Sequence, residues 1–249
     1  MVHSQHTEFF SIRAYAVDAK KQVHVPALIQ LMHETAMQHV LDLKLSVWDL
    51  EPQNLAWVLT RLQVKIHQLP SLGQKIKIVT NPSGFEKIRT FRDYRVFTED
   101  GQLLASAVSL WFLMNTQTRR LARVPAEIRQ TIEGCIQTIN EFLPKPDTKP
   151  PVFPNAQYQR TFRVGYHDLD FNEHLNNIHY VKWLLDTLPA SFQKQHQLQQ
   201  LDLFYKMECV LDDQIQGEVG SSGGNAFHHR LLKETQEVAS AQSQWSVIL

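Results

Sequence analysis

Three polar residues recur at alternate positions within HDLDFNEHLNNIHYVKW, residues 167–183. In an extended backbone, Asp170, Asn172 and His174 would share one face, because successive side chains point to opposite sides. A carboxylate, an amide and an imidazole can together hold a water molecule, take its proton and polarise a carbonyl group. The spacing would suit a hydrolytic site, but Asp170 and Asn172 are also typical turn residues, and the pattern taken alone favours a turn.

A helix is predicted directly after these residues, with Asn176 or Asn177 as its N-cap and Pro189 as its stop. The apolar residues at helical spacing are Ile178, Val181, Leu185 and Leu188. Free N–H groups and the helix dipole favour negative charge at such an N-terminus. We therefore expect an oxyanion to be stabilised there, with Asn176 and Asn177 contacting the substrate.

Composition excludes several classes of protein. Among the 249 residues, 25 Lys and Arg balance 25 Asp and Glu, so bulk charge does not favour nucleic acid or membrane binding. No apolar run approaches the roughly 20 residues that span a bilayer, and the N-terminus resembles neither a secretion signal nor a transit peptide. Cys135 and Cys209 form no disulfide framework or CxxC pair. We expect a cytoplasmic protein.

A metal site is the alternative interpretation of the polar cluster. Its candidate ligands are His167, Asp168, Asp170, His174 and His179. The segment lacks the HExxH spacing of helical zinc sites, so the sequence favours a site without metal.

A proline-rich segment divides the chain. PKPDTKPPVFP, residues 144–154, holds five of the 11 prolines and is poor in backbone donors. We expect two modules, residues 1–143 and 157–249, joined by a linker over residues 144–156.

The two modules have the same predicted plan, a helix followed by an antiparallel meander, which is an α+β fold. The first has a strand near 10–16, a helix from Pro26 to about residue 43, strands near 55–66, 75–80, 87–97 and 103–114, and a polar helix near 125–142. Asp100-Gly101 predicts a hairpin between the last two strands. The second has a strand near 158–166, a helix near 177–188, and strands near 200–211, 214–219, 226–234 and 237–247.

The chain resembles the acyl-acyl carrier protein thioesterases along nearly its full length. The matching segments are SIRAY (11–15), ETAMQHV (34–40), AWVLTR (56–61), LWFLMNTQTRRL (110–121), DLDFNEHLNNIHYVKW (168–183) and YKMEC (205–209). The resemblance implies a double hotdog fold and hydrolysis of fatty acyl-acyl carrier protein to free fatty acid and carrier protein. It implies no cofactor and no metal. Plant members carry a plastid transit peptide, so this chain looks like a bacterial member.

The resemblance also implies the site residues. The catalytic Asp, Asn, His and Glu of the family correspond here to Asp170, Asn172, His174 and Glu208. In our hypothesis Glu208 orients and deprotonates a water, Asn172 holds that water or the thioester oxygen, and Asp170 orients the site. His174 acts as general base or proton donor, and the sequence leaves the choice between His174 and Glu208 open.

Cys209 is an alternative nucleophile, as some proposals for the family have it. Glu208 and Cys209 are neighbours on a predicted strand, so their side chains should point to opposite faces. The alternation favours Glu208 as the functional residue and Cys209 as a small buried one. We expect a Cys209→Ala variant to keep near-normal turnover.

Substrate and partner contacts follow from the resemblance and from charge. The first module is expected to supply the acyl pocket, with Leu28, Met32 and Trp57 as candidate lining residues, although each is also a candidate for an ordinary core residue.

Acyl carrier proteins are acidic, so docking requires a local basic patch, for which the densest cluster is Arg119, Arg120 and Arg123. Lys87, Arg89 and Arg92 are a second possibility, although strand alternation would put Arg92 opposite the other two.

Two rival functions stay open at this point. A coenzyme A thioesterase shares the thioester chemistry, and a non-catalytic acyl-binding module shares the fold. The set Asp170, Asn172, His174 and Glu208 argues against the second rival. Two modules in one chain are compatible with a monomer or a homodimer.

Overall fold

The computed structural model describes residues 4–146, 149 and 152–248, and the chain divides into two compact units. The first unit comprises residues 1–62 and 67–146, and the second comprises residues 63–66 and 147–249. The linker over 144–156 stays a prediction. Positions 147, 148, 150 and 151 of that linker lie outside the described residues, as do 1–3 and 249.

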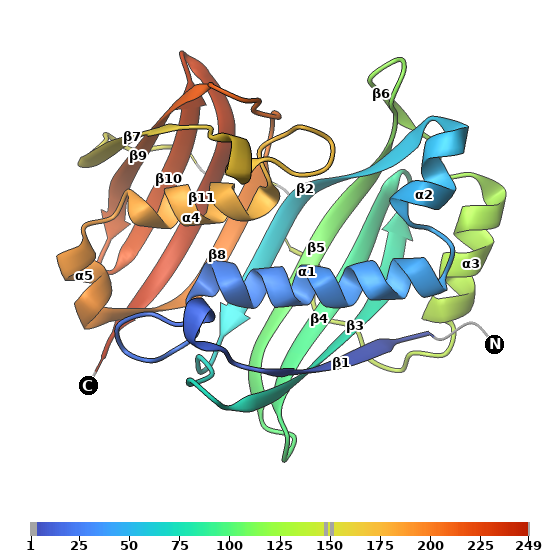
Figure 1. Ribbon diagram of the computed structural model, residues 1–249, viewed down its shortest axis with the longest axis horizontal. Coiled ribbons are helices and arrows are strands. Elements are labelled where there is room, and N and C mark those ends of the chain that lie inside the picture. The colour runs from blue at the N-terminus through green and yellow to red at the C-terminus, as the bar shows by residue number, and fades with distance from the viewer. Residues whose placement is uncertain (1–3, 147–148, 150–151, 249) are drawn as a thin grey trace. The chain divides into compact units, whose positions relative to one another are not determined.

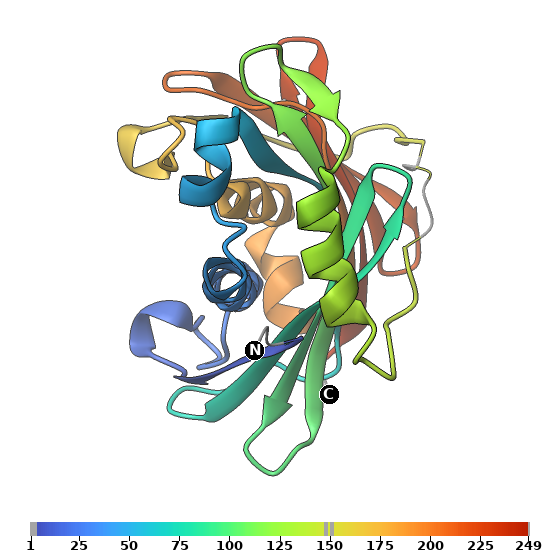
Figure 2. The ribbon, with the colours of Figure 1, turned by 90° about the vertical axis from the view of Figure 1, so that its right-hand side faces the viewer.

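The first unit combines an antiparallel sheet with one long helix (Figure 1). The strands are β1 (His6–Ser11), β2 (Leu55–Ile66), β3 (Lys75–Glu86), β4 (Arg89–Thr98), β5 (Leu103–Asn115) and β6 (Arg120–Ala122). Their order is β1-β3-β4-β5-β2, and β6 pairs with β5. The helices are α1 (Val25–Asp42), α2 (Val47–Leu50) and α3 (Ala126–Ile136). Figures 1 and 2 show α1 crossing one face of this sheet.

Local sequence explains where α1 begins. The ring Nδ1 of His24 accepts the N–H of Ala27 at 3.0 Å and thereby caps the helix, and Pro26 fits the first turn, where no N–H is needed. The helix then buries one apolar stripe that includes Leu28 and Met32. The predicted first helix is therefore confirmed.

The second unit repeats this plan with a shorter helix (Figure 1). Its strands are β7 (Tyr158–Arg163), β8 (His196–Tyr205), β9 (Gln214–Gly223), β10 (Ala226–Lys233) and β11 (Gln236–Val247). They pair antiparallel in the order β8-β11-β10-β9-β7. The helices are α4 (Asn177–Asp186) and α5 (Ala190–Gln195). The predicted α+β plan is thus found in both units.

Several predicted ends differ from the structure. The hairpin at Asp100-Gly101 is confirmed between β4 and β5, whereas α3 ends at Ile136 instead of near residue 142. The strand predicted for 200–211 was wrong beyond Tyr205. Both Lys206 and Met207 donate their N–H to the carbonyl of Val238, which ends the regular ladder. Cys209 and Val210 pair instead with His174 and Leu175, and the loop that contains His174 and Leu175 carries the candidate site.

Candidate active site

The segment that carries Asp170, Asn172 and His174 is a tight turn and not the extended strand we predicted. Leu169 and Leu175 form an isolated β-bridge, and the N–H of Asp170 donates to the carbonyl of His174 at 2.7 Å. The turn closes through Glu173, whose φ of 62° lies in the left-handed region. The three side chains therefore surround a turn, and the period-two argument for a shared face was wrong.

The carboxylate of Asp170 holds this turn together. Its Oδ1 atom accepts the N–H of Asn172 at 2.8 Å and the N–H of His174 at 3.2 Å. These are the bonds of an Asx-type turn, in which a short acidic side chain replaces a backbone acceptor. Asp170 thus fixes the backbone that carries the other two residues, whereas the Asn172 side chain is exposed at its tip.

The predicted helix follows and begins where expected. Asn176 is the N-cap of α4, and its Oδ1 accepts the N–H of Ile178 at 3.1 Å. Asn177 is the first helical residue. The first N–H groups of a helix have no intrahelical acceptor, so this end of α4 can stabilise an anion.

Glu208 reaches His174 because the chain after β8 pairs with the turn. The N–H of Leu175 donates to the carbonyl of Cys209 at 2.8 Å, and His174 forms a β-bridge with Val210. As a result His174 Nε2 lies 3.4 Å from Glu208 Oε2. The two side chains are 28% and 36% exposed, so both are open to an incoming substrate.

Cys209 is buried, in contrast to this pair. Its exposure is 0%, and burial raises the pKa of its thiol above the ordinary value. This difference in burial agrees with the expected opposition of Glu208 and Cys209, although the two residues lie beyond the end of β8 and not on the strand we predicted. A buried, protonated thiol is a poor nucleophile because the thiolate is the reactive form.

A second histidine–carboxylate pair lies beside the first helical turn and was not assigned from sequence. His179 Nδ1 lies 3.5 Å from Asp168 Oδ1, while Asp168 Oδ2 accepts the N–H of Gly165 at 2.8 Å. Burial lowers the pKa of His179, and Asp168 partly opposes this shift. From the sequence, both residues were candidate metal ligands, and Asp168 was alternatively expected to bond local backbone, as it does with Gly165.

The described residues contain neither a metal-binding cluster nor a membrane-spanning helix. No group of three or more His, Cys, Asp or Glu side chains is arranged there to hold a metal ion. Within the same residues, no helix is both long and apolar enough to cross a membrane.

The candidate acyl-pocket residues pack as core side chains. Leu28 and Met32 are 0% and 1% exposed on α1. Trp57 on β2 is partly buried, and its Nε1 donates to the carbonyl of Leu45 at 3.3 Å. Their contact with an acyl chain stays a prediction.

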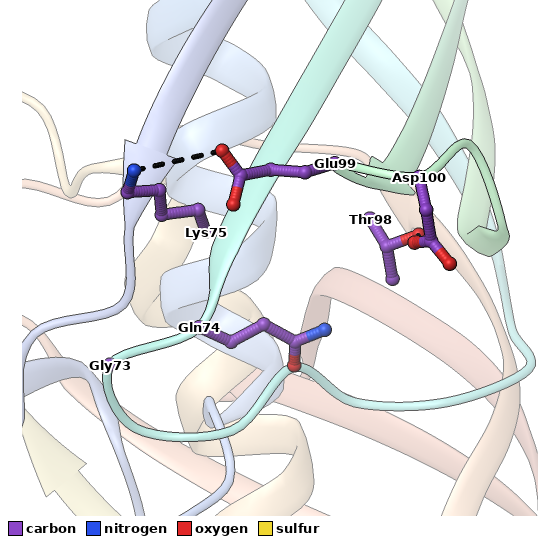
Figure 3. A pocket seen from close by; sticks show the side chains of 6 residues that line it. All are labelled: Gly73, Gln74, Lys75, Thr98, Glu99 and Asp100. Atoms are coloured by element: carbon purple, nitrogen blue, oxygen red, sulfur yellow. Dashed lines mark hydrogen bonds and ion pairs between the residues drawn. The ribbon is translucent and has the colours of Figure 1, made fainter.

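A surface depression in the first unit does not have the lining that an acyl chain requires (Figure 3). It lies beside the start of β3 and the β4–β5 hairpin and is lined by Gly73, Gln74, Lys75, Thr98, Glu99 and Asp100. Lys75 and Glu99 form an ion pair of 3.7 Å across it. None of these six residues is a large aliphatic or aromatic residue, the kind that lines a site for a hydrocarbon tail.

The candidate docking arginines are accessible. Arg119, Arg120 and Arg123 are exposed on and directly after the β5–β6 hairpin. In the second possible docking cluster, Lys87, Arg89 and Arg92, the third residue is excluded from docking because Arg92 is buried. Its Nη1 lies 3.1 Å from His39 Nδ1 and donates to Thr80 Oγ1 at 3.2 Å.

Comparison with solved structures identifies the fold. The 12:0-ACP thioesterase from Umbellularia californica superposes with a TM-score of 0.91 and 26% identity, covering 100% of this chain and 99% of that chain. An acyl-ACP thioesterase from Bacteroides thetaiotaomicron has the same fold, with a TM-score of 0.88 and 22% identity over 98% of each chain. The predicted double hotdog fold is confirmed.

Sequence comparison then identifies the family. Residues 3–132 match the acyl-ACP thioesterase N-terminal domain, and residues 154–247 match the C-terminal domain of the same family. The chain therefore belongs to the acyl-ACP thioesterase family. The chloroplastic palmitoyl-acyl carrier protein thioesterase of Arabidopsis thaliana is 30% identical over an alignment of 258 positions, which covers 95% of this chain and 63% of that protein. The chain thus spans about three fifths of the length of such curated relatives.

Proposed function

We propose that this protein hydrolyses the thioester of fatty acyl-acyl carrier protein and releases free fatty acid and carrier protein. The observation that carries the proposal is the approach of His174 Nε2 to Glu208 Oε2, 3.4 Å apart and open to solvent. Family membership supports the same substrate class. The cytoplasmic location and the choice between monomer and homodimer stay predictions.

Glu208 is assigned the role of general base in this mechanism. Its carboxylate takes a proton from a water molecule, whose oxygen attacks the thioester carbonyl carbon. The resulting tetrahedral intermediate collapses and breaks the carbon–sulfur bond. The proton passes from Glu208 to His174, which lies 3.4 Å away, and then to the departing pantetheine sulfur.

The turn and the helix provide the remaining parts of the site. Asn172, exposed at the tip of the turn, holds the attacking water or the thioester oxygen. The N–H of Ile178 is already bonded to Asn176, so the amide of Asn177 is the candidate donor to the oxyanion. Asp170 acts through the backbone of the turn.

The test is release of free fatty acid from matched acyl-acyl carrier protein and acyl-coenzyme A panels, from C8 to C18. Wild type and His174→Ala are assayed side by side. Preference for the carrier protein, lost in the variant, is the expected result. Preference for coenzyme A would move the protein to the rival class of thioesterases, and no turnover by folded wild type would favour an acyl-binding module.

A further inference from the structure

The hydroxyl of Tyr180, on α4, bonds to the backbone on both sides of Glu208. It donates to the carbonyl of Met207 at 3.1 Å and accepts the N–H of Cys209 at 3.0 Å. These groups belong to the two peptide units that flank Glu208. We propose that Tyr180 is a positioning residue that holds Glu208 against His174, an inference that rests on the proposed hydrolysis.

The side chain of Tyr180 is itself well fixed. It is only 3% exposed, and its ring packs edge-on against Tyr205 with centroids 5.6 Å apart. Burial raises the pKa of the Tyr180 phenol well above its ordinary value, so the hydroxyl keeps its proton. A rigid, neutral hydroxyl can donate one hydrogen bond and accept another at the same time.

The first unit provides an internal comparison for this arrangement. There the N–H of Val23 donates to the carbonyl of Pro70 at 2.8 Å, as Leu175 donates to Cys209 at 2.8 Å. The next pair also agrees, since Gln22 forms a β-bridge with Ser71 as His174 does with Val210. Pro70 therefore occupies the position of Cys209.

The two hydrogen bonds of the Tyr180 hydroxyl to Met207 and Cys209, which we call the clamp, are absent from the corresponding part of the first unit. Counted from the N-caps His24 and Asn176, Leu28 is the fourth residue of α1 and Tyr180 is the fourth residue of α4. Leu28 has no hydroxyl and Pro70 has no N–H, so neither hydrogen bond can form there. Leu69, the residue before Pro70, occupies the position of Glu208. The tyrosine is thus present in the unit that has Glu208 and absent from the unit that has Leu69 in its place.

The clamp has a clear energetic consequence for Glu208. The regular ladder of β8 ends at Tyr205, so the flanking peptides depend on bonds from outside the sheet. Removal of the Tyr180 hydroxyl leaves the buried Cys209 amide without its acceptor. A shift of about 1 Å in a reacting group can cost on the order of 100-fold in rate. We therefore expect a loss in kcat with little change in KM.

The experiment compares Tyr180→Phe with Tyr94→Phe, which removes the hydroxyl of another fully buried tyrosine. With acyl-acyl carrier protein as substrate, we expect Tyr180→Phe to lower kcat about 10-fold or more at nearly constant KM, and Tyr94→Phe to remain within about twofold of wild type. In a Glu208→Gln background, Tyr180→Phe should have no additional effect, because the two changes remove the same function.

A second pair of variants tests the clamp without altering Tyr180. Cys209→Pro removes the N–H donor, whereas Cys209→Ala keeps it, and we expect only the proline variant to lose kcat. Unchanged kcat in folded Tyr180→Phe, or a full additional loss in the Glu208→Gln background, would overturn the positioning role. Absence of wild-type turnover would instead overturn the proposed hydrolysis, and the role of Tyr180 with it.

Discussion

Asp18 and Asp170 make the same two hydrogen bonds in the two units. The Oδ1 atom of each accepts from the backbone N–H groups two and four residues further along the chain, at 2.8 and 3.3 Å for Asp18 and at 2.8 and 3.2 Å for Asp170. The residues that carry these N–H groups are Lys and Gln in the first unit but Asn172 and His174 in the second. The aspartate therefore builds the turn whether or not the turn carries site residues.

Replacement of these aspartates should separate stability from activity. Each of the two hydrogen bonds contributes about 0.5–1.5 kcal/mol. Asp18→Ala and Asp170→Ala should therefore lower the free energy of unfolding by amounts similar to each other. Only Asp170→Ala should lower kcat, because only its turn carries Asn172 and His174. Urea unfolding and turnover assays measure the two effects. Lost turnover in Asp170→Ala at wild-type stability would indicate a direct chemical role for Asp170.

Glu208 and His174 should behave as one functional unit. General acid–base groups typically contribute about 10²–10⁴-fold, so Glu208→Gln and His174→Ala should each lower kcat within that range. The kcat of the double variant should be only slightly below that of the less active single variant, because the pair shares one proton path. Single-turnover kinetics provide the measurement, and additive losses would argue for independent roles.

Loss of the Cys209 thiol should have little effect on catalysis. The side chain is fully buried and its thiol pKa is raised by burial, so Cys209→Ala should keep kcat within about twofold of wild type. A small loss of stability is expected from the lost packing. A folded but inactive Cys209→Ala protein would make the cysteine the nucleophile.

Stability should fall in mild acid because of two histidines, His229, which is buried, and His33, which is partly buried. Burial lowers the pKa of both His33 and His229 from 6.5 to about 4. Between these pH values the unfolded chain binds protons that the folded chain does not, so the free energy of unfolding falls as pH drops from 6.5 toward 4. For each histidine this loss amounts to at most about 3 kcal/mol.

His229 provides the sharper test of this pH effect. Its ring Nδ1 donates to the carbonyl of Leu184 at 2.9 Å, and its Nε2 accepts the hydroxyl of Ser243 at 2.6 Å, so both nitrogens are used in the neutral form. A His229→Gln variant cannot titrate there and should lose less stability between pH 7 and pH 4.5. An equal loss in wild type and variant, measured by urea unfolding, would contradict the assignment.

The β5–β6 arginines should affect substrate bound to protein more than small substrates. Reversal of charge at Arg119 and Arg120 removes attraction for an acidic carrier, so KM for acyl-acyl carrier protein should rise several-fold at low salt. KM for a small acyl thioester should change little. Equal effects on both substrates would exclude a docking role, and reversal at Lys194 in α5 provides a control at a different surface position.

The sequence predicted regular elements well where periodicity or capping was strong. β2 has the bounds expected from its alternation, and α4 begins after its Asn176 cap. The ends of β8 and α3 were less well predicted, because the sequence pattern continues where the hydrogen-bond partners do not. In β8 the ladder ends at Tyr205, although the following residues still resemble a strand.

The candidate site shows the same limit. Residue types made Asp170 and His174 candidates, but the turn between them depends on a left-handed Glu173 and on a side-chain acceptor. A period-two pattern cannot reveal either feature. Tyr180 appeared only as an aromatic residue within an amphipathic helix, since its partners at Met207 and Cys209 are distant in the chain. The equivalence of Asp18 and Asp170 likewise required the hydrogen bonds of both units.

The repeated turn also makes the first unit a scaffold for protein engineering. It already has the aspartate, the left-handed residue and the capped helix, with Lys21 at φ 59° where the second unit has Glu173 at φ 62°. Five positions at which it differs from the candidate site are Lys20, Gln22, Leu28, Leu69 and Pro70. Grafting Asn, His, Tyr, Glu and Cys at these positions would ask whether a backbone and five side chains suffice to create a catalyst.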